Sequence, residues 1–207
     1  MASRKLEYFM LYKPYGVLSQ FTDRGGRQTL SDYGPFPPTV YPVGRLDADS
    51  EGLLLLTDDA MIKEYLLEPR FEHPRTYWVQ VERVPTDSAL RQLEGGVLVE
   101  AYKTKPADVR LLEGEPLLPP RAVPIRFRKH VPTAWIELTL REGRNRQVRK
   151  MTAAVGHPTL RLVRVRIGSL SLGSMRPGES RPWNEAELEE ILKHMQRAYH
   201  KKPRRAP

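Results

Sequence analysis

Three segments of the chain contain residues whose types and spacing could do chemistry. The first supplies three carboxylates within five residues, the second a pair of aromatic side chains in a strand-like run, and the third a dense group of cations. These segments are GRLDADSEGLLLLT at residues 44–57, RTYWVQV at 75–81 and EGRNRQVRKM at 142–151.

The carboxylates of the first segment allow three interpretations from residue types alone. They could lie in a solvated turn, Asp47 and Asp49 could bind a hard cation such as Mg²⁺, or Asp47 could be catalytic. The segment begins at Gly44 and leads into an apolar run at 53–56 that is suited to burial on both faces. An exposed carboxylate backed by a rigid buried strand is the arrangement that a preorganised nucleophile needs, and this favours catalysis by Asp47.

The cations of the third segment are spaced for a helix. Arg146, Arg149 and Lys150 stand at i, i+3 and i+4, which would place them on one helical face. With Arg144 they give four cations in seven residues, and Arg164 belongs to a second basic run. A solvated basic face is the alternative, but this density favours contact with nucleic-acid phosphates. We therefore predict that Arg144, Arg146, Lys150 and Arg164 bind phosphate.

The aromatic pair of the second segment has an unresolved orientation. Tyr77 and Trp78 are adjacent in an expected strand, so their side chains point to opposite faces. One of them should pack in the core while the other faces outward or into a cleft. Residue types alone leave open which one does so.

The composition of the whole chain bounds the class of protein. In 207 residues, 34 Lys and Arg oppose 25 Asp and Glu, which gives a formal charge of +9 and suggests a polyanion partner, although some basic proteins are merely soluble. The absence of cysteine excludes disulfides, thiolate nucleophiles and cysteine-based zinc sites. The chain has no apolar run long enough for a bilayer span and its start lacks the features of a secretory signal, so we expect a cytoplasmic protein without membrane contact.

Periodic patterns and turn signals predict alternating strands and helices that position these segments. We expect a first strand at 7–12, later strands at 77–81, 135–140 and 160–167, and shorter ones at 97–99 and 109–112. Helices are expected from a cap at Asp58 to about Leu67, from a cap at Thr86 to Gly95, over 148–155, and from Glu185 to about Ala198. The proline-rich stretch 113–132 should form a surface connection that can touch a partner.

The three segments together resemble a known family. GRLDADSEGLLLLT resembles the catalytic motif of the RsuA-type pseudouridine synthases nearly residue for residue, and the resemblance extends to LYKPYGVLSQ at 11–20. RTYWVQV resembles the second motif of the family, with its tyrosine at Tyr77. EGRNRQVRKM, followed by VGHPTLRLVRVRIG, resembles the third. Taken in order, the motifs cover most of the chain from about residue 6 to 168.

This resemblance implies an α+β fold, the pseudouridine synthase fold, with a mixed, largely antiparallel sheet, peripheral helices and a central catalytic cleft. It implies one catalytic domain over residues 1–200, with two lobes around the cleft, and a flexible basic tail at 201–207. Only about six residues precede the first strand, so we do not expect the small S4 RNA-binding domain with which many members begin. LSQFTD and RKHVPTAWIEL are most similar to members that act on large-subunit ribosomal RNA, which implies uridine 2457 of 23S rRNA as the target.

The resemblance also implies roles for individual residues. Asp47 is implied to be the nucleophile on a flipped-out uridine, Tyr77 to lie against the uracil, and Arg149 to pair with Asp47. Arg45 is implied to occupy the position that the base vacates. No cofactor and no metal are implied, and the partner is 23S rRNA or a large-subunit precursor, bound by a monomer.

Two alternatives belong to other classes of protein. The basic charge equally fits a non-catalytic rRNA-binding or ribosome-assembly protein, from which only Asp47 in its motif separates the synthase. A metal-dependent nuclease could use Asp47, Asp49 and Asp58, but the usual companion histidine or carboxylate is not evident, and EDTA would abolish its activity. A helix-turn-helix DNA binder is disfavoured by the absence of its pattern.

Overall fold

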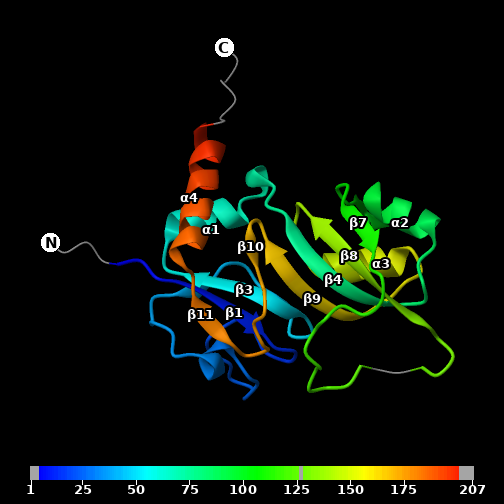
Figure 1. Ribbon diagram of the computed structural model, residues 1–207, viewed down its shortest axis with the longest axis horizontal. Helices are drawn as coiled ribbons and strands as arrows, with labels where there is room; N and C mark the ends of the chain where they lie inside the picture. Colours follow the sequence, from blue (N-terminus) through cyan, green and yellow to red (C-terminus); the bar gives the residue numbers. More distant parts are fainter. Residues whose placement is uncertain (1–4, 126–127, 201–207) are drawn as a thin grey trace, which may run out of the picture.

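The computed structural model describes residues 5–125 and 128–200, and the tail expected at 201–207 lies outside this range. Within the described residues, a nine-stranded sheet crosses the molecule (Figure 1). Its main path has the order β11-β1-β3-β9-β4-β8-β7, with β10 paired to β9 and β2 to β3, and β5 and β6 form a separate pair. In the described residues β3 and β9 are the parallel neighbours and the other pairs are antiparallel. The predicted mixed, largely antiparallel α+β fold is confirmed.

The expected strands are present with small changes in their bounds. The strands are β1 (Tyr8–Lys13), β2 (Tyr41–Pro42), β3 (Glu51–Thr57), β4 (Arg75–Glu82), β5 (Leu98–Val99), β6 (Tyr102–Lys103), β7 (Asp108–Leu111), β8 (Thr133–Leu140), β9 (Thr159–Ile167), β10 (Leu170–Ser171) and β11 (Ser180–Pro182).

The helices lie at the two ends of the sheet. Figure 1 shows α1 and α4 together at one end, and α2 and α3 near β7 at the other. Their bounds are α1 (Ala60–Leu67), α2 (Asp87–Glu94), α3 (Gln147–Ala154) and α4 (Glu185–His200). Two short 3-10 turns, Leu30–Tyr33 and Pro69–Phe71, lie in the connections. Among the residues that the structure describes, no helix has the length and apolar character needed to cross a membrane.

One helix cap was predicted correctly and another was not. Thr86 caps α2 by accepting a hydrogen bond from the Ala89 amide, as predicted. Asp59, not Asp58, caps α1, because its carboxylate accepts from the first amides of that helix. The Asp58 carboxylate instead accepts from the Glu7 amide and the Thr39 hydroxyl, so it joins the end of β3 to the start of β1.

The core explains why β3 is a rigid support. Leu53 and Leu55 pack with residues of α1 and α4, whereas Leu54 and Leu56 pack on the other face with side chains from β1 and the 14–40 loop. All four leucines have no exposed surface. The predicted burial of both faces is confirmed, and each leucine contributes about 2 kcal/mol of transfer free energy. A third cluster fills the space between β4, β8, α2 and α3.

Gly52 permits the parallel contact between β3 and β9. Its backbone lies at φ +106°, and it is the register partner of Arg164. A Cβ atom at this position would overlap the backbone carbonyl oxygen of Arg164. Only glycine fits this close approach, which places the segment before β3 beside the middle of β9.

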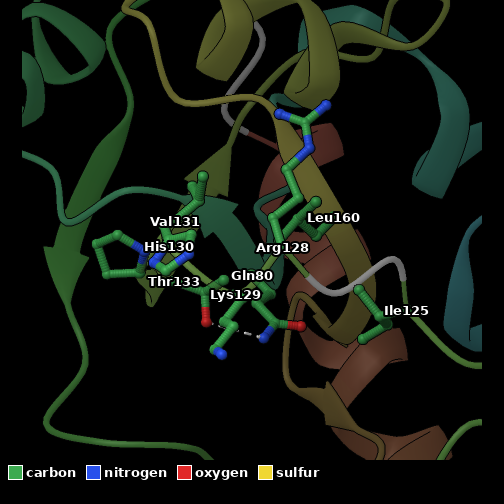
Figure 2. Close-up of a pocket in the computed structure, with 9 residues that line it drawn as sticks. Gln80, Ile125, Arg128, Lys129, His130, Val131, Thr133 and Leu160 are labelled. Atoms are coloured by element: carbon green, nitrogen blue, oxygen red, sulfur yellow. Dashed lines mark hydrogen bonds between the residues drawn. The ribbon is translucent and has the colours of Figure 1, made fainter.

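The predicted surface connection follows the sheet as an irregular chain. In its described parts, 113–125 and 128–132, it contains no helix or strand. The Pro119 carbonyl accepts a hydrogen bond from the Arg161 guanidinium at 2.9 Å, and the Arg121 guanidinium lies 4.1 Å from the centre of the Tyr15 ring. Its far end borders a cavity of about 470 Å³ beside β4 and β8, where Gln80 donates a hydrogen bond to Thr133 (Figure 2).

Candidate active site

A cleft of about 1000 Å³ collects most of the residues that the sequence predicted to be functional. The carboxylate loop, residues 44–50, forms one wall, and the arginine segment, residues 142–150, forms another. Six predicted site residues line this space, whereas Arg149 and Lys150 are not among the lining residues. The six are Arg45, Asp47, Tyr77, Arg144, Arg146 and Arg164.

Backbone hydrogen bonds hold the carboxylate loop in place. The Ser19 hydroxyl donates to the Leu46 carbonyl at 2.7 Å and accepts from the Leu46 amide at 3.0 Å. The Gly16 amide donates to the Ala48 carbonyl at 2.7 Å, and the Ser50 amide closes the turn onto the Asp47 carbonyl. The Asp47 side chain nevertheless keeps 37% of its surface exposed. A fixed backbone thus presents an accessible carboxylate to the cleft.

Two paired strands supply Tyr77 and Arg164. These residues are register partners on β4 and β9, and both line the cleft. Trp78 points to the opposite face, where its indole N–H donates to Glu137 at 2.9 Å. The alternation of side chains along β4 therefore assigns Tyr77, not Trp78, to the cleft.

Arg164, which was predicted from charge to bind phosphate, is a buried residue at the edge of the cleft. Only 4% of this residue is exposed, and its Nε donates to the Leu53 carbonyl at 2.8 Å. Burial lowers the pKa of the Arg164 guanidinium, which neighbouring Tyr77 partly opposes. The Arg164 side chain points inward from β9 and its guanidinium holds β3, so little of it is accessible to a phosphate, and the expected phosphate contact stays a prediction.

Asp49 forms the main ion pairs with Arg146 and Arg149, although Arg149 was expected to pair with Asp47. The Arg146 guanidinium binds both Asp49 carboxylate oxygens, at 3.0 and 2.7 Å, whereas its Nη1 is 3.6 Å from Asp47 Oδ2. Arg149 donates to the Asp49 backbone carbonyl at 2.7 Å, and its Nε lies 3.4 Å from Asp49 Oδ2. The contacts of Arg149 in this structure are thus with Asp49, because its guanidinium lies against the backbone of the carboxylate loop, and the implied pair of Arg149 with Asp47 stays a prediction.

The expected single helical face of cations is also incorrect. Arg146 precedes α3 as its N-cap residue, with φ 52° in the left-handed region. Arg149 lies inside the helix with a side chain that is only 15% exposed, whereas Lys150 pairs with Glu100 at 2.9 Å. Arg144 stays exposed and its guanidinium stacks 3.3 Å from the Tyr102 ring centre. Arg144, Arg146 and Lys150 keep accessible surface, and Arg149 largely does not.

The charges around Asp49 favour its ionised form. Burial alone would raise the pKa of Asp49, but the hydrogen bonds from Arg146 and the charge of Arg149 outweigh it and lower that pKa. The same hydrogen bonds raise the pKa of Arg146, whereas burial lowers the pKa of Arg149. Opposite charges within a few ångströms thus hold this carboxylate ionised.

Lys13 is a buried cation beside the carboxylate loop. It has no exposed surface, and its ammonium donates to the carbonyls of Pro14 and Val17 at 2.9 and 2.8 Å. Burial lowers the pKa of Lys13 to about 8, against the charges of Glu51, Asp49 and Asp47, which raise it. The lysine therefore fixes the turn whose Gly16 amide holds the carboxylate loop.

Two anchoring residues were missed by the sequence reading. Glu142 accepts hydrogen bonds from the Tyr102 hydroxyl, the Lys105 amide and the Gln147 side chain, which ties the start of the arginine segment to the β6 region. Glu51 forms a buried double hydrogen bond with Arg161 at 2.9 Å. No local pattern marks these partners, because they are about 40 and 110 residues apart in the chain.

Asp47, Asp49 and Asp58 do not form the cluster that a metal-dependent nuclease would need. Asp58 follows the far end of β3, a strand of seven residues, so it lies roughly 20 Å along the chain direction from Asp49. In the described part of the chain, no three His, Asp or Glu side chains are close enough to hold a metal ion together.

Comparisons with known proteins agree with this geometry. Residues 7–154 match the family model described as RNA pseudouridylate synthase. The chain is 58% identical over 174 residues to ribosomal large subunit pseudouridine synthase E of Xanthomonas campestris, which covers 83% of this chain and 92% of that protein. It is 48% identical to the Vibrio vulnificus protein of the same name, over 91% of this chain and 77% of that one. A crystal structure of a pseudouridylate synthase superposes with a TM-score of 0.76 at 29% identity, covering 92% of this chain and 76% of that chain.

Proposed function

The chain belongs to the RNA pseudouridylate synthase family and is an RNA pseudouridine synthase, and we propose that it isomerises one uridine of 23S ribosomal RNA with Asp47 as the nucleophile. The observation that carries this proposal is the accessible Asp47 carboxylate on a hydrogen-bonded loop, facing a cleft that also contains Tyr77. Fixed backbone beside an open side chain is what a positioned nucleophile requires.

The reaction rearranges one nucleoside without loss of atoms. The bond from ribose C1′ to uracil N1 breaks and the bond from C1′ to C5 forms. C5 loses its proton and N1 takes one up, either the same proton or one exchanged with solvent, so the atoms balance. The uridine must first leave its stack, which costs a few kcal/mol and needs compensating contacts. Arg45 is suited to the vacated position, because it is exposed at the cleft and its hydrogen bond to Gln20 is 3.5 Å long.

The residues around the cleft divide this work. Asp47 acts as the nucleophile while the C1′–N1 bond breaks, and its carboxylate is released again when C1′ is joined to C5. Tyr77 lies against the uracil and assists proton movement at C5. The guanidinium of Arg146 lies 3.6 Å from the Asp47 carboxylate, so a positive charge stands beside the proposed nucleophile. Arg144, Arg146 and Lys150 keep part of their side-chain surface exposed in or near the cleft, and we assign them the contacts with RNA phosphates.

The proposed substrate follows from the relatives and from the charge. Two relatives that cover most of this chain are named for the large ribosomal subunit, and the formal charge of +9 suits a long polyanion. We propose uridine 2457 of 23S rRNA as the target, in free rRNA or in a large-subunit precursor. We further propose that residues 1–200 act as a single catalytic domain, in a cytoplasmic monomer, with a flexible basic tail at 201–207.

Chemical mapping of pseudouridine tests the reaction and the site together. Unmodified 23S transcript is incubated with the wild-type protein, with Asp47→Asn and with Asp23→Asn, and pseudouridine is located by carbodiimide-stop sequencing. Asp23 is a matched control, since it is another arginine-bound aspartate but lies outside the cleft residues. We expect one new stop at uridine 2457 with the wild type and with Asp23→Asn, and none with Asp47→Asn.

Other outcomes would redirect the proposal. Unchanged product with Asp47→Asn would refute the nucleophile, and a single stop elsewhere would replace the target. RNA binding without any new stop, on transcript, on precursor particles and on small-subunit RNA, would instead support a non-catalytic rRNA-binding protein.

A further inference from the structure

Arg144 and Tyr102 form a stacked pair in the wall of the cleft. Both residues line the cleft, and the centre of the Arg144 guanidinium lies 3.3 Å from the centre of the Tyr102 ring. At this separation the guanidinium must lie flat against the ring, because a tilted one would push a nitrogen atom into it. The Arg144 side chain is nevertheless 56% exposed, so the face of the guanidinium that is turned away from the ring is accessible.

Hydrogen bonds hold both members of this pair in place. The Tyr102 hydroxyl donates to the Glu142 carboxylate at 2.7 Å, and the Glu142 side chain is only 10% exposed. The Arg144 amide donates to the side-chain oxygen of Gln147 at 3.0 Å, and Gln147 is buried. The flat surface of the guanidinium is therefore formed in the absence of RNA, and little order has to be created when a ligand binds to it.

The stacked pair lies beside the position proposed for the target uridine. Arg146 follows Arg144 by two residues, and its guanidinium is 3.6 Å from the Asp47 carboxylate. Two residues span at most about 7 Å of backbone, and Tyr77 lines the same cleft. An RNA strand that places its uridine at Asp47 therefore brings the neighbouring nucleotides within reach of the pair.

The nucleotides beside an extruded uridine need a surface of this kind. Extrusion removes the stacking between the uridine and its neighbours, and contacts with the protein must compensate for that loss. Unpaired bases stack on aromatic rings and on the planes of arginine guanidinium groups, and such a stack accepts any base because every base has a flat face. The edges of the Arg144 guanidinium stay free for the phosphate contact assigned above.

We propose that the Arg144–Tyr102 pair is a stacking platform for the base of a nucleotide next to the target uridine. The platform binds this base by its flat face, not by its hydrogen-bonding edge, so it recognises unstacked RNA and tolerates different bases. This inference rests on the proposed function, because the platform receives the base when the uridine lies in the cleft at Asp47.

A conservative substitution separates stacking from charge. Arg144→Lys keeps the positive charge but loses the planar guanidinium, and filter binding measures its affinity for 23S transcript over a range of salt. We expect about tenfold weaker binding, the scale of one stacked base, with an unchanged slope of log affinity against log salt. Arg70→Lys is the matched control and should bind like the wild type, since Arg70 is 52% exposed and lies over the Phe71 ring but is not among the cleft residues.

Abasic RNA identifies the nucleotide that the platform binds. 23S transcripts are assembled by splint ligation with a single abasic ribose at successive positions on either side of the target uridine. At one of these positions we expect the wild-type protein to bind about tenfold more weakly and Arg144→Lys to lose nothing further, the non-additive result expected of groups in contact. Replacing that base by another one should change the affinity less than about threefold.

Three outcomes would overturn the inference. They are a wild-type affinity in Arg144→Lys, a loss that appears as a lower salt slope, or a loss that stays the same with every abasic transcript. Melting curves establish that the variants are folded. Should Arg144→Lys not fold, the abasic series with Arg144→Gln decides the same question.

Pseudouridine mapping with the wild-type protein distinguishes failure of the platform from failure of the proposed function. If the protein converts a uridine and no abasic position is coupled to Arg144, only the platform fails. If Asp47→Asn still converts that uridine, the proposed nucleophile fails and the abasic series still judges the platform. If no uridine is converted, the proposed function fails and the platform fails with it.

Discussion

The two walls of the cleft are held by different physics. The carboxylate loop leads directly into β3, whose leucines are completely buried, and its turn is closed by backbone hydrogen bonds. The arginine segment packs one apolar residue, Val148, on the core and is otherwise anchored by polar groups, through Glu142 at its start and Asp49 further along. Exposed ion pairs are weakened by salt and by competing anions, whereas apolar packing is not. The proposed nucleophile is thus fixed, and the cations stay responsive to RNA phosphate.

Gly52→Ala should produce the largest effect, because it disturbs β3, the buried strand that supports the carboxylate loop. The new Cβ would overlap backbone atoms of Arg164 and force β3 away from β9. We expect a loss of at least about 3 kcal/mol in the free energy of unfolding, measured by urea titration. Gly26→Ala is the matched control, since Gly26 also has positive φ but has open space around it, and it should cost about 1 kcal/mol. Equal costs at the two positions would contradict the close approach.

Tyr77→Phe tests the proposed chemical role of the Tyr77 hydroxyl in the cleft. Without its hydroxyl, the ring still packs against the cluster of β4, β8, α2 and α3, so binding should be preserved. We expect a roughly 100-fold slower single turnover, the lower end of the scale of lost proton-transfer assistance, with affinity changed less than about threefold. Equal losses in rate and affinity would argue against a chemical role.

His73 should make the apolar side of the cleft sensitive to acid. It is 8% exposed and packs edge-on against Tyr65. Burial, then the charges of Arg75 and His194, lower the pKa of His73 to about 4. The unfolded chain takes up this proton near pH 6.5 and the folded chain only near 4, so stability falls as the pH drops between those values. We expect a loss of roughly 2 kcal/mol, and His73→Leu should flatten this part of the profile measured by chemical denaturation. If the stability of His73→Leu kept the same dependence on pH, a group other than His73 would be responsible for it.

The smallest effect should come from single substitutions of exposed cations in the arginine segment, which should lower the salt dependence of RNA binding. Arg144→Gln and Lys150→Gln should each lower the slope of log affinity against log salt by about one, measured by filter binding from low to moderate salt. Arg164→Gln should leave that slope unchanged and lower the melting temperature, because Arg164 is buried. A reduced slope in Arg164→Gln would reinstate it as a phosphate contact.

Much of the architecture follows from local patterns that the sequence contains. The helices and the long strands of the described residues were predicted because periodicity, caps and glycine stops are properties of short segments. The error at Asp58 arose because two adjacent aspartates are equally good caps, and only the hydrogen bonds of Asp58 to Glu7 and Thr39 distinguish them. The burial of Arg164 and the contacts of Arg149 with Asp49 could not be predicted for a similar reason, since side-chain type shows charge but not direction.

The sequence by itself determined the fold family, the position of Asp47 on a supported loop and the excess of cations, because these depend on residue types and on their spacing along the chain. Only the tertiary structure decided which arginine meets which carboxylate, that Tyr77 rather than Trp78 faces the cleft, and that Arg164 is internal. Asp49 and Arg146 are 97 residues apart in the chain. Their contact exists because β3 and β9 pack in parallel across Gly52, a relation between distant segments that local spacing does not encode.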